Sequence, residues 1–361
     1  MAIKYKWLAD RLKELIKRYM EKGIEKLPTE NEICSKYRVS RQTVRLSLSM
    51  LEQEGLITKK HGSGSFITGL LDDSTKNLIG ILISSDQEYI YPRILSDIHN
   101  TLSQNGFSDK IFVTGNQTNV EREILLEILN KPLRGIIVEG CKSALPNPNL
   151  DLYRKLISRG TTVIFLFSYY PALTECLYVK DENYYGSSIL IKHLVEMGHT
   201  SIGGIFKADD LQGIERYQGF METMRDFHLT VPDNRIGWFH SCELDRLEKD
   251  KNTDFLKRFV GESLKSCTAV VCYNDEIAYW LIRELSATGY QMPDDISIAA
   301  FDNTYLSNSD LLTVTTLSHK SHEMGNKAAM TMIEKLKGFP VISQEIPWEL
   351  ILKESTKKNI E

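Results

Sequence analysis

The chain has 361 residues, which is enough for two or three globular domains. With 42% hydrophobic and 25% charged residues, its composition is typical of a folded soluble protein and excludes a disordered one. No apolar run is long enough to span a bilayer, and the N-terminal segment lacks the apolar core and cleavage site of a signal peptide. The six cysteines include no CxxC pair, so we expect free thiols, no metal site and a cytoplasmic protein.

The net charge of −4 is unevenly distributed along the chain. Residues 1–70 contain fourteen Lys and Arg against eight Asp and Glu, whereas the remainder contains thirty against forty. A basic N-terminal region on an acidic body suggests that this region meets a polyanion. Charge alone leaves a second interpretation open, in which the region simply has a solvated basic surface.

The basic region carries the pattern of three short helices. Apolar residues at helical spacing predict a first helix over residues 6–21. Thr29 and Glu32 fit a capping box at the start of a second helix. Ser40 can cap a third helix over residues 41–54, whose apolar face is formed by Val44, Leu48 and Leu51.

A hairpin follows these helices. Gly55 is placed to end the third helix, and two short strands, 56–59 and 65–68, flank the turn HGSG. Its glycines permit the positive φ angles that a tight turn requires. Three helices followed by a hairpin predict a winged helix-turn-helix, in which the third helix enters the major groove of DNA.

The first turns of the predicted third helix carry Arg41, Gln42 and Arg45, which point away from its apolar face. Arg can pair bidentately with guanine and Gln with adenine, so these residues are candidates for reading bases. His61, at the tip of the wing, could enter the minor groove. The residues suited to phosphate contacts are Lys4, Lys59 and Lys60.

This region resembles the DNA-binding domain of the GntR family over residues 4–68. The likeness lies in the segment LPTENEICSKYRVSRQTVRLSLSMLEQEGLI. The resemblance implies DNA contacts at Glu30, Arg41, Thr43, Arg45 and Gly64. The alternative is a winged helix that makes only protein contacts. The complete predicted DNA-binding set is Lys4, Glu30, Ser40, Arg41, Gln42, Thr43, Arg45, Lys59, His61, Gly62 and Gly64.

The remainder of the chain reads as an α/β domain with two lobes. Apolar segments of strand length alternate with helical stretches, which predicts parallel sheets covered by helices on both faces. Their number is too large for one compact unit, so we expect two lobes and crossings near Ser168, His319 and Gly338. The predicted strands are 78–83, 110–115, 135–140, 162–167, 201–206, 269–274 and 296–301.

Polar residues cluster just after the ends of these strands. In open α/β sheets, ligands bind beyond the carboxyl ends of the strands, so we expect a cleft there. Carboxylates, amides and basic side chains can satisfy the hydroxyls of a sugar, and aromatic side chains can pack on its apolar face. The candidate aromatic residues are Tyr89, Tyr91, Tyr169, Tyr273 and Trp238.

The body resembles the sugar-binding domain of LacI-type repressors over residues 77–355. The likeness lies in the segments VKDENYYGSSILIKHLVEMGHTSIGGI, ERYQGF, CYNDEIA and DDISIAAFDN. A GntR-type head on such a body is similar to the arabinose repressors of Gram-positive bacteria, as are VEGCKSAL and GIFKADDLQGIERYQGF. The resemblance implies L-arabinose as effector. The predicted ligand-binding set is Tyr91, Glu139, Lys207, Asp209, Gln212, Arg216, Asn274, Asp275, Asp302 and His319.

Several of these residues have simpler interpretations. Glu139 could instead pair with Lys142 or Lys207, and Lys207 with Asp209 could form a solvated loop. Asn274 could cap a helix, with or without touching a ligand. His319 could be an ordinary satisfied polar residue.

The sequence therefore predicts a repressor with a DNA-binding domain at residues 1–70, a linker at 71–77 and a sugar-binding, dimerising domain at 78–361. We expect a homodimer that leaves operator DNA when a small sugar binds. The alternatives are a different effector, an activator, a repressor that needs its ligand, and a sugar-binding transport protein. No catalytic or nucleotide-binding motif supports an enzyme.

Overall fold

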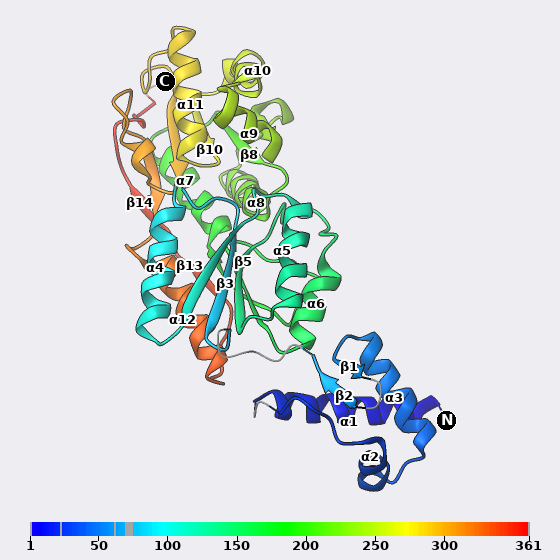
Figure 1. Ribbon diagram of the computed structural model, residues 1–361. Helices are drawn as coiled ribbons and strands as arrows, with labels where there is room; N and C mark the ends of the chain where they lie inside the picture. Colours follow the sequence, from blue (N-terminus) through cyan, green and yellow to red (C-terminus); the bar gives the residue numbers. More distant parts are fainter. Residues whose placement is uncertain (1, 22–23, 61–62, 69–74, 88, 360–361) are drawn as a thin grey trace.

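A computed structural model describes residues 2–21, 24–60, 63–68, 75–87 and 89–359. Figure 1 shows a small head beside one end of an elongated body, which consists of two lobes stacked end to end. Most of the predicted linker lies outside the described residues, and its last three residues form a turn before the first strand of the body. Among the described helices, none is long and apolar enough to cross a membrane.

The head is a winged helix-turn-helix, as predicted. The capping box of Thr29 and Glu32 is present, and Ser40 caps the third helix by accepting a hydrogen bond from the Thr43 amide. Gly55 and Gly64 have φ angles of 70° and 109°, which L side chains rarely adopt. The head consists of α1 (Ala2–Glu21), α2 (Glu30–Tyr37), α3 (Arg41–Gln53), β1 (Ile57–Lys60) and β2 (Gly64–Ile67).

Lobe 1 is a sheet of parallel strands in the order β13-β7-β6-β5-β3-β4. Helices α4 and α12 pack on one face of the sheet, and α5 and α6 pack on the other. The strands are β3 (Leu78–Ile83), β4 (Ser108–Val113), β5 (Gly135–Glu139), β6 (Thr162–Leu166), β7 (Leu177–Asp181) and β13 (Gln344–Ile346). The helices are α4 (Tyr91–Gln104), α5 (Thr118–Asn130), α6 (Leu150–Ser158) and α12 (Glu323–Leu336).

Lobe 2 repeats this plan in the order β14-β12-β11-β10-β8-β9, with only β14 antiparallel to its neighbour. Helices α7 and α8 cover one face, and α9, α10 and α11 cover the other. The strands are β8 (Ile202–Lys207), β9 (Ile236–Phe239), β10 (Ala269–Cys272), β11 (Ser297–Phe301), β12 (Thr315–Ser318) and β14 (Glu349–Ile351). The helices are α7 (Asn183–Glu196), α8 (Leu211–Asp226), α9 (Ser241–Asp250), α10 (Asp254–Glu262) and α11 (Asp275–Ala287).

The crossings between the lobes differ in part from those predicted. The crossing near His319 is confirmed, but Ser168 follows β6 within lobe 1, and Gly338 follows α12 within the same lobe. These loops carry ordinary turn residues, so their sequence does not distinguish a turn from a crossing. The chain passes between the lobes at residue 182, at residues 319–322 and at residues 347–348.

All seven predicted strands are present within two residues of their predicted bounds. Five others, β7, β9, β12, β13 and β14, were not predicted. Each has three to five residues, and β7, β12 and β13 each contain at least two polar residues, so no continuous apolar run marks them as it marks the predicted strands. The two that flank the last crossing, β13 and β14, belong to different lobes, and only tertiary contacts decide their pairing.

Candidate functional site

The exposed face of α3 carries the residues predicted to read bases. Arg41, Gln42 and Arg45 are exposed, while Val44 and Leu48 on the opposite face are buried in the core of the head. Burying the apolar face therefore orients the three polar side chains outward. This arrangement is the one that a recognition helix needs in order to present side chains to a major groove.

Arg45 is held in place by Glu30 of the preceding helix. Its Nε lies 3.0 Å from a carboxylate oxygen of Glu30, and 69% of its side chain is exposed. The pair joins α2 to α3 and leaves most of the Arg45 side chain exposed. Glu30, predicted as a DNA contact, therefore also positions Arg45 in the free head.

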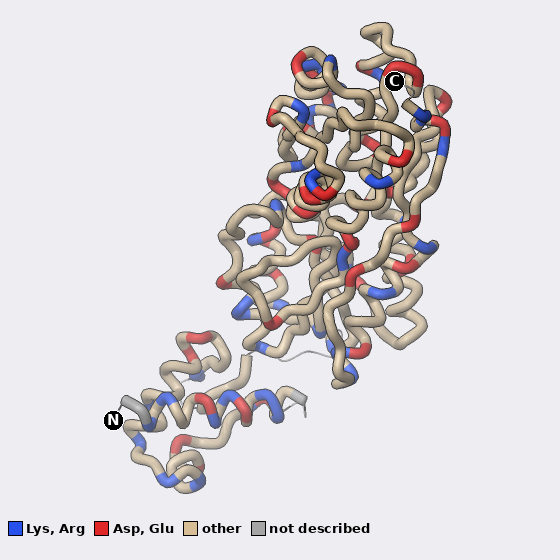
Figure 2. The backbone as a smooth tube through the Cα atoms, turned by 180° about the vertical axis from the view of Figure 1, so that it is seen from behind, with Lys and Arg blue, Asp and Glu red and all other residues tan. Residues whose placement is uncertain are grey.

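The other predicted DNA contacts lie around this helix. The hydroxyls of Ser40 and Thr43 are 2.9 Å apart at the N-terminus of α3, and Lys4 is exposed on α1. The Lys59 ammonium lies 3.0 Å from Glu52, so part of its charge is already paired. Figure 2 shows Lys and Arg spread over the whole head rather than gathered on one element. Gly64 begins β2, and His61 and Gly62 lie outside the described residues.

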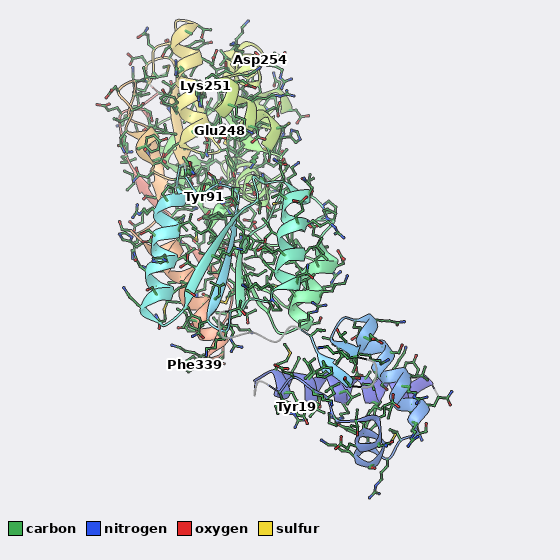
Figure 3. All side chains as sticks on the ribbon, in the orientation of Figure 1. Tyr19, Tyr91, Glu248, Lys251, Asp254 and Phe339 are labelled. Atoms are coloured by element: carbon green, nitrogen blue, oxygen red, sulfur yellow. The ribbon has the colours of Figure 1, made fainter. Side chains whose placement is uncertain are left out.

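A cavity of about 660 Å³ lies between the two lobes, at the carboxyl ends of their strands. Tyr91, at the first turn of α4, lies at the level where the lobes meet (Figure 3). Eight of the ten predicted ligand contacts line this cavity: Tyr91, Glu139, Lys207, Gln212, Arg216, Asn274, Asp302 and His319.

Glu139 at the end of β5 is one polar centre of the cavity. Its carboxylate accepts hydrogen bonds from the Ser84 amide at 2.6 Å and from the Tyr91 hydroxyl at 3.0 Å. These donors replace the predicted alternative partners Lys142 and Lys207. Burial raises the pKa of Glu139, and the hydrogen bonds from Ser84 and Tyr91 oppose that rise.

Arg216 of α8 is the other polar centre and is almost completely buried. Its guanidinium donates to Asn183 Oδ1 at 3.0 Å and to the Tyr273 carbonyl at 2.5 Å. It lies 3.5 Å from Asp302 and 3.8 Å from Asp181, and its plane lies over the Phe301 ring at 4.1 Å. The position of the guanidinium is therefore determined from several sides, and it neutralises two buried carboxylates.

Lys207 and Asp209 are buried rather than part of a solvated loop. The Lys207 ammonium, at the end of β8, lies 3.6 Å from Asp210. The carboxylate of Asp210 also accepts a hydrogen bond from the Tyr273 hydroxyl at 2.9 Å. Lys207, Asp210 and Tyr273 all line the cavity, so they form a second cluster that can exchange hydrogen bonds with a ligand.

Two predicted ligand contacts do not line the cavity. The carboxylate of Asp209 accepts from the Ser241 amide at the start of α9, at 3.0 and 3.1 Å. Asp275 is completely buried and accepts from the Thr304 amide at 2.6 Å and from the Thr316 hydroxyl at 2.7 Å. Burial and the charge of nearby Asp302 together raise the pKa of Asp275 to about 7. Both residues lie beyond their strands, Asp209 in the turn after β8 and Asp275 at the first position of α11, and their carboxylates bond to donors of neighbouring segments instead of reaching the cavity.

Asn274 combines the two roles considered for it. Its side chain accepts a hydrogen bond from the Ile277 amide at 3.0 Å and so caps α11, and the residue also lines the cavity. Among the candidate aromatic residues, Tyr89, Tyr91 and Tyr273 line the cavity. Tyr169 and Trp238 do not: Tyr169 stacks on Tyr178 in lobe 1, and Trp238 packs against Tyr217 in lobe 2.

Comparisons with known proteins match both the head and the body. The bacterial regulatory proteins of the gntR family match residues 4–67, and the periplasmic binding protein-like domain matches residues 191–356. The arabinose metabolism transcriptional repressor of Geobacillus stearothermophilus is 34% identical over 342 residues, which cover 92% of each chain. That of Halalkalibacterium halodurans is 31% identical, over 92% of this chain and 89% of its own. The chain belongs to the family of arabinose metabolism transcriptional repressors.

A solved structure supports the fold of the repressor body. The transcription regulator CcpA of Lactococcus lactis superposes with a TM-score of 0.68 at 17% identity, over 78% of this chain and 100% of that one. Members of this family are DNA-binding transcriptional regulators and not enzymes. The chain is thus a transcriptional repressor with a GntR-type head and a LacI-type effector body.

Three residues in or next to the crossings contact one another where the lobes meet, and we call this cluster of Asp181, His319 and Trp348 the hinge of the repressor. Asp181 precedes the first crossing, His319 lies on the second and Trp348 on the third. The His319 ring stacks on the Trp348 ring at 3.7 Å, and its Nε2 lies 2.7 Å from Asp181. Its Nδ1 lies 3.0 Å from the Pro347 carbonyl. Because both ring nitrogens face acceptors, only the imidazolium can donate to both.

Asp181 and Trp348 were missed as cavity residues. Asp181 ends β7, a strand that was not predicted, and it accepts a hydrogen bond from Gln212 at 2.7 Å. Trp348 lies in a two-residue crossing with no motif around it. A systematic search of residues that follow apolar runs, extended to runs of four or five residues, would have found Asp181. No local signal marks Trp348.

We expect the hinge to make stability depend on pH. Burial alone would lower the pKa of His319, but the hydrogen bond and the charge of Asp181 outweigh it, so the pKa is raised. The stabilisation is therefore complete below the unfolded pKa of about 6.5 and is lost as the pH rises through the folded pKa. His319→Gln should lower the free energy of unfolding at pH 6 by about 1.5–3 kcal/mol.

Urea denaturation of both proteins between pH 6 and pH 9 measures this effect. The difference between wild type and variant should shrink as the pH rises, and the other histidines contribute equally to both proteins. A difference that is constant over this range would show that the imidazolium charge of His319 does not stabilise the hinge.

Proposed function

We propose that the repressor binds operator DNA as a homodimer and is released when L-arabinose occupies the cleft. DNA binding is assigned to residues 1–70 and effector binding and dimerisation to residues 78–361, with residues 71–77 as a linker. The observation that carries the proposal is the cavity between the lobes, in which Glu139, Asp302 and Lys207 face one space together with three tyrosines.

The chemistry of the cavity suits a small neutral polyol. Carboxylates such as Glu139 and Asp302 accept hydrogen bonds from sugar hydroxyls, whereas Lys207 and Arg216 donate to the ring and hydroxyl oxygens. Tyrosine rings offer apolar surface to the C–H face of a sugar. The names of the two family members above favour arabinose among such sugars. Carboxylates on several sides disfavour a phosphorylated sugar, because they would repel its charge.

A homodimer explains how one small head could read an extended operator. Two identical heads related by a twofold axis match a pseudo-palindromic site, and their spacing depends on how the two bodies are held. A sugar that binds one lobe arrangement more tightly than another would change that spacing. Sedimentation equilibrium of the full chain at micromolar concentration tests the dimer directly.

A gel-shift titration of operator DNA with the full chain tests the proposal. Saturating L-arabinose is expected to weaken operator binding by about 5–150-fold, the range typical of allosteric coupling. D-xylose, a pentose of the same size, and D-ribose 5-phosphate serve as controls and should act weakly. Tighter binding in the presence of L-arabinose would show that the sugar is a corepressor. No effect of L-arabinose, together with no heat of binding in calorimetry, would exclude it as the effector.

A further inference from the structure

We propose that Ser143 is a positioning residue that holds the two lobes together from outside the sugar cavity and so sets the sensitivity of the repressor to its effector. Ser143 lies in the segment VEGCKSAL, in the turn that follows β5 of lobe 1. It is 4% exposed and, unlike its neighbours Glu139 and Lys142, does not line the cavity. The inference rests on the proposed function, because it concerns closure over that effector.

The Ser143 hydroxyl makes two hydrogen bonds to lobe 2. It donates to Asp210 Oδ1 at 3.0 Å, and it accepts from the Leu211 amide at 2.9 Å. Leu211 is the first residue of α8, and Asp210 is its N-cap, whose carboxylate accepts from the Gln212 amide. Ser143 thus caps, from the opposite lobe, a helix whose first amides have no partner within the helix.

Neighbouring contacts support the same closed arrangement. The Ala144 amide donates to the Asp209 carbonyl at 3.4 Å, next to Ser143. The Asn116 side chain donates to the Ser241 hydroxyl at 2.8 Å and accepts from the Lys142 amide at 2.8 Å. Asn116 and Ser241 line the cavity, so their replacement would also alter sugar contacts. Ser143 is therefore the member of this group whose effect on closure can be separated from ligand binding.

The position of Asp210 connects Ser143 to the effector site. Asp210 lies next to Lys207 and Tyr273 in the cavity, and α8 also carries Gln212 and Arg216. When the lobes separate, the Leu211 amide and the Asp210 carboxylate lose their partner and must be satisfied by water. The two hydrogen bonds of Ser143 therefore stabilise the closed state independently of the sugar. If they are lost, the fraction of closed molecules falls, and the apparent affinity for the sugar falls in the same proportion.

The test compares three variants of the full chain with the wild type. Ser143→Ala removes both hydrogen bonds to lobe 2, whereas Ser143→Thr retains the hydroxyl. Ser158→Ala is the matched control, because the Ser158 hydroxyl donates only to the Lys155 carbonyl within lobe 1, at 2.8 Å. Calorimetry gives the dissociation constant for L-arabinose, and gel shifts give the sugar concentration for half-maximal release. Small-angle X-ray scattering of the sugar-free chain reports the separation of the lobes.

Ser143→Ala is expected to bind L-arabinose about tenfold more weakly, in keeping with the loss of two hydrogen bonds of ordinary net strength. Half-maximal release should require a similarly higher sugar concentration, and operator affinity without sugar should not fall, because the open state is the one that binds DNA. Its radius of gyration without sugar should exceed that of the wild type, and Ser143→Thr should recover most of each effect. Ser158→Ala should behave as the wild type does.

Two results would overturn the assignment of Ser143. One is wild-type sugar affinity in Ser143→Ala, and the other is an unchanged radius of gyration in its sugar-free state. The scattering result stands whether or not L-arabinose is the effector. If the wild type itself shows no response to L-arabinose, the proposed function fails, and scattering alone then decides the role of Ser143.

Discussion

Replacing Arg216 with methionine is expected to abolish the response to L-arabinose and to destabilise the body by about 3–5 kcal/mol. Methionine fills a similar volume but leaves Asp181 and Asp302 buried without their cation. Burial already raises the pKa of Asp302, and Arg216 is the main influence that lowers it. Without Arg216 the pKa of this carboxylate should rise further, and its protonated form would present a different hydrogen-bonding pattern to a sugar.

Thermal or urea denaturation measures the loss of stability, and calorimetry measures sugar binding. Arg216→Lys is a first control, because it keeps the charge but cannot reach Asn183 and the Tyr273 carbonyl together. Asp302→Asn combined with Arg216→Met should recover part of the lost stability by removing one uncompensated charge. If the double variant is no more stable than Arg216→Met, an uncompensated Asp302 is not the source of the destabilisation.

Replacing Arg45 with alanine is expected to weaken operator binding by about 1–3 kcal/mol and to relax specificity at one base pair. The guanidinium is exposed on the base-reading face of α3 and oriented by Glu30, so its removal leaves the fold of the head intact. Glu30→Gln should have a smaller effect in the same direction, because it loosens Arg45 without removing it. Fluorescence anisotropy with the operator and with random DNA measures both affinities.

Lys59→Ala provides the contrast to Arg45→Ala. An exposed ammonium on the wing suits a phosphate contact, so its loss should weaken all DNA sequences alike and reduce the salt dependence of binding by about one ion. In the free head Lys59 is paired with Glu52, which should make the effect modest. Equal losses on operator and random DNA for Arg45→Ala would contradict its role in reading bases.

Much of the DNA-binding head can be predicted from local sequence. The bounds of α2 and α3 follow from Thr29, Glu32 and Ser40, whose side chains bond to amides three residues away. Gly55 and Gly64 mark positive φ angles for a similarly local reason. The outward face of α3 then follows from the helical period, because burying Val44 and Leu48 leaves Arg41 and Arg45 exposed.

The effector cleft is predictable only in outline. The strand-end rule and the family resemblance together located eight cavity residues, yet they also selected Asp209 and Asp275, which do not line the cavity and accept hydrogen bonds from backbone amides. Both residues lie past the end of their strand, in a turn or at the start of a helix, where the alternation of a strand no longer sets the direction of a side chain. The strand that ends at Asp181 was not predicted, although Asp181 lies in the segment VKDENYYG that carries part of the resemblance to LacI-type repressors.

Helix caps, turns and the exposed face of the recognition helix are decided by interactions within a few residues, so the chain specifies them before any tertiary structure forms. The hinge and the closure of the lobes are different. His319 meets Asp181 across 138 residues, and Ser143 meets Asp210 across 67. Such pairs exist only after both sheets have formed and the three crossings have set one lobe against the other. Their energy depends on that placement, and no local pattern encodes it.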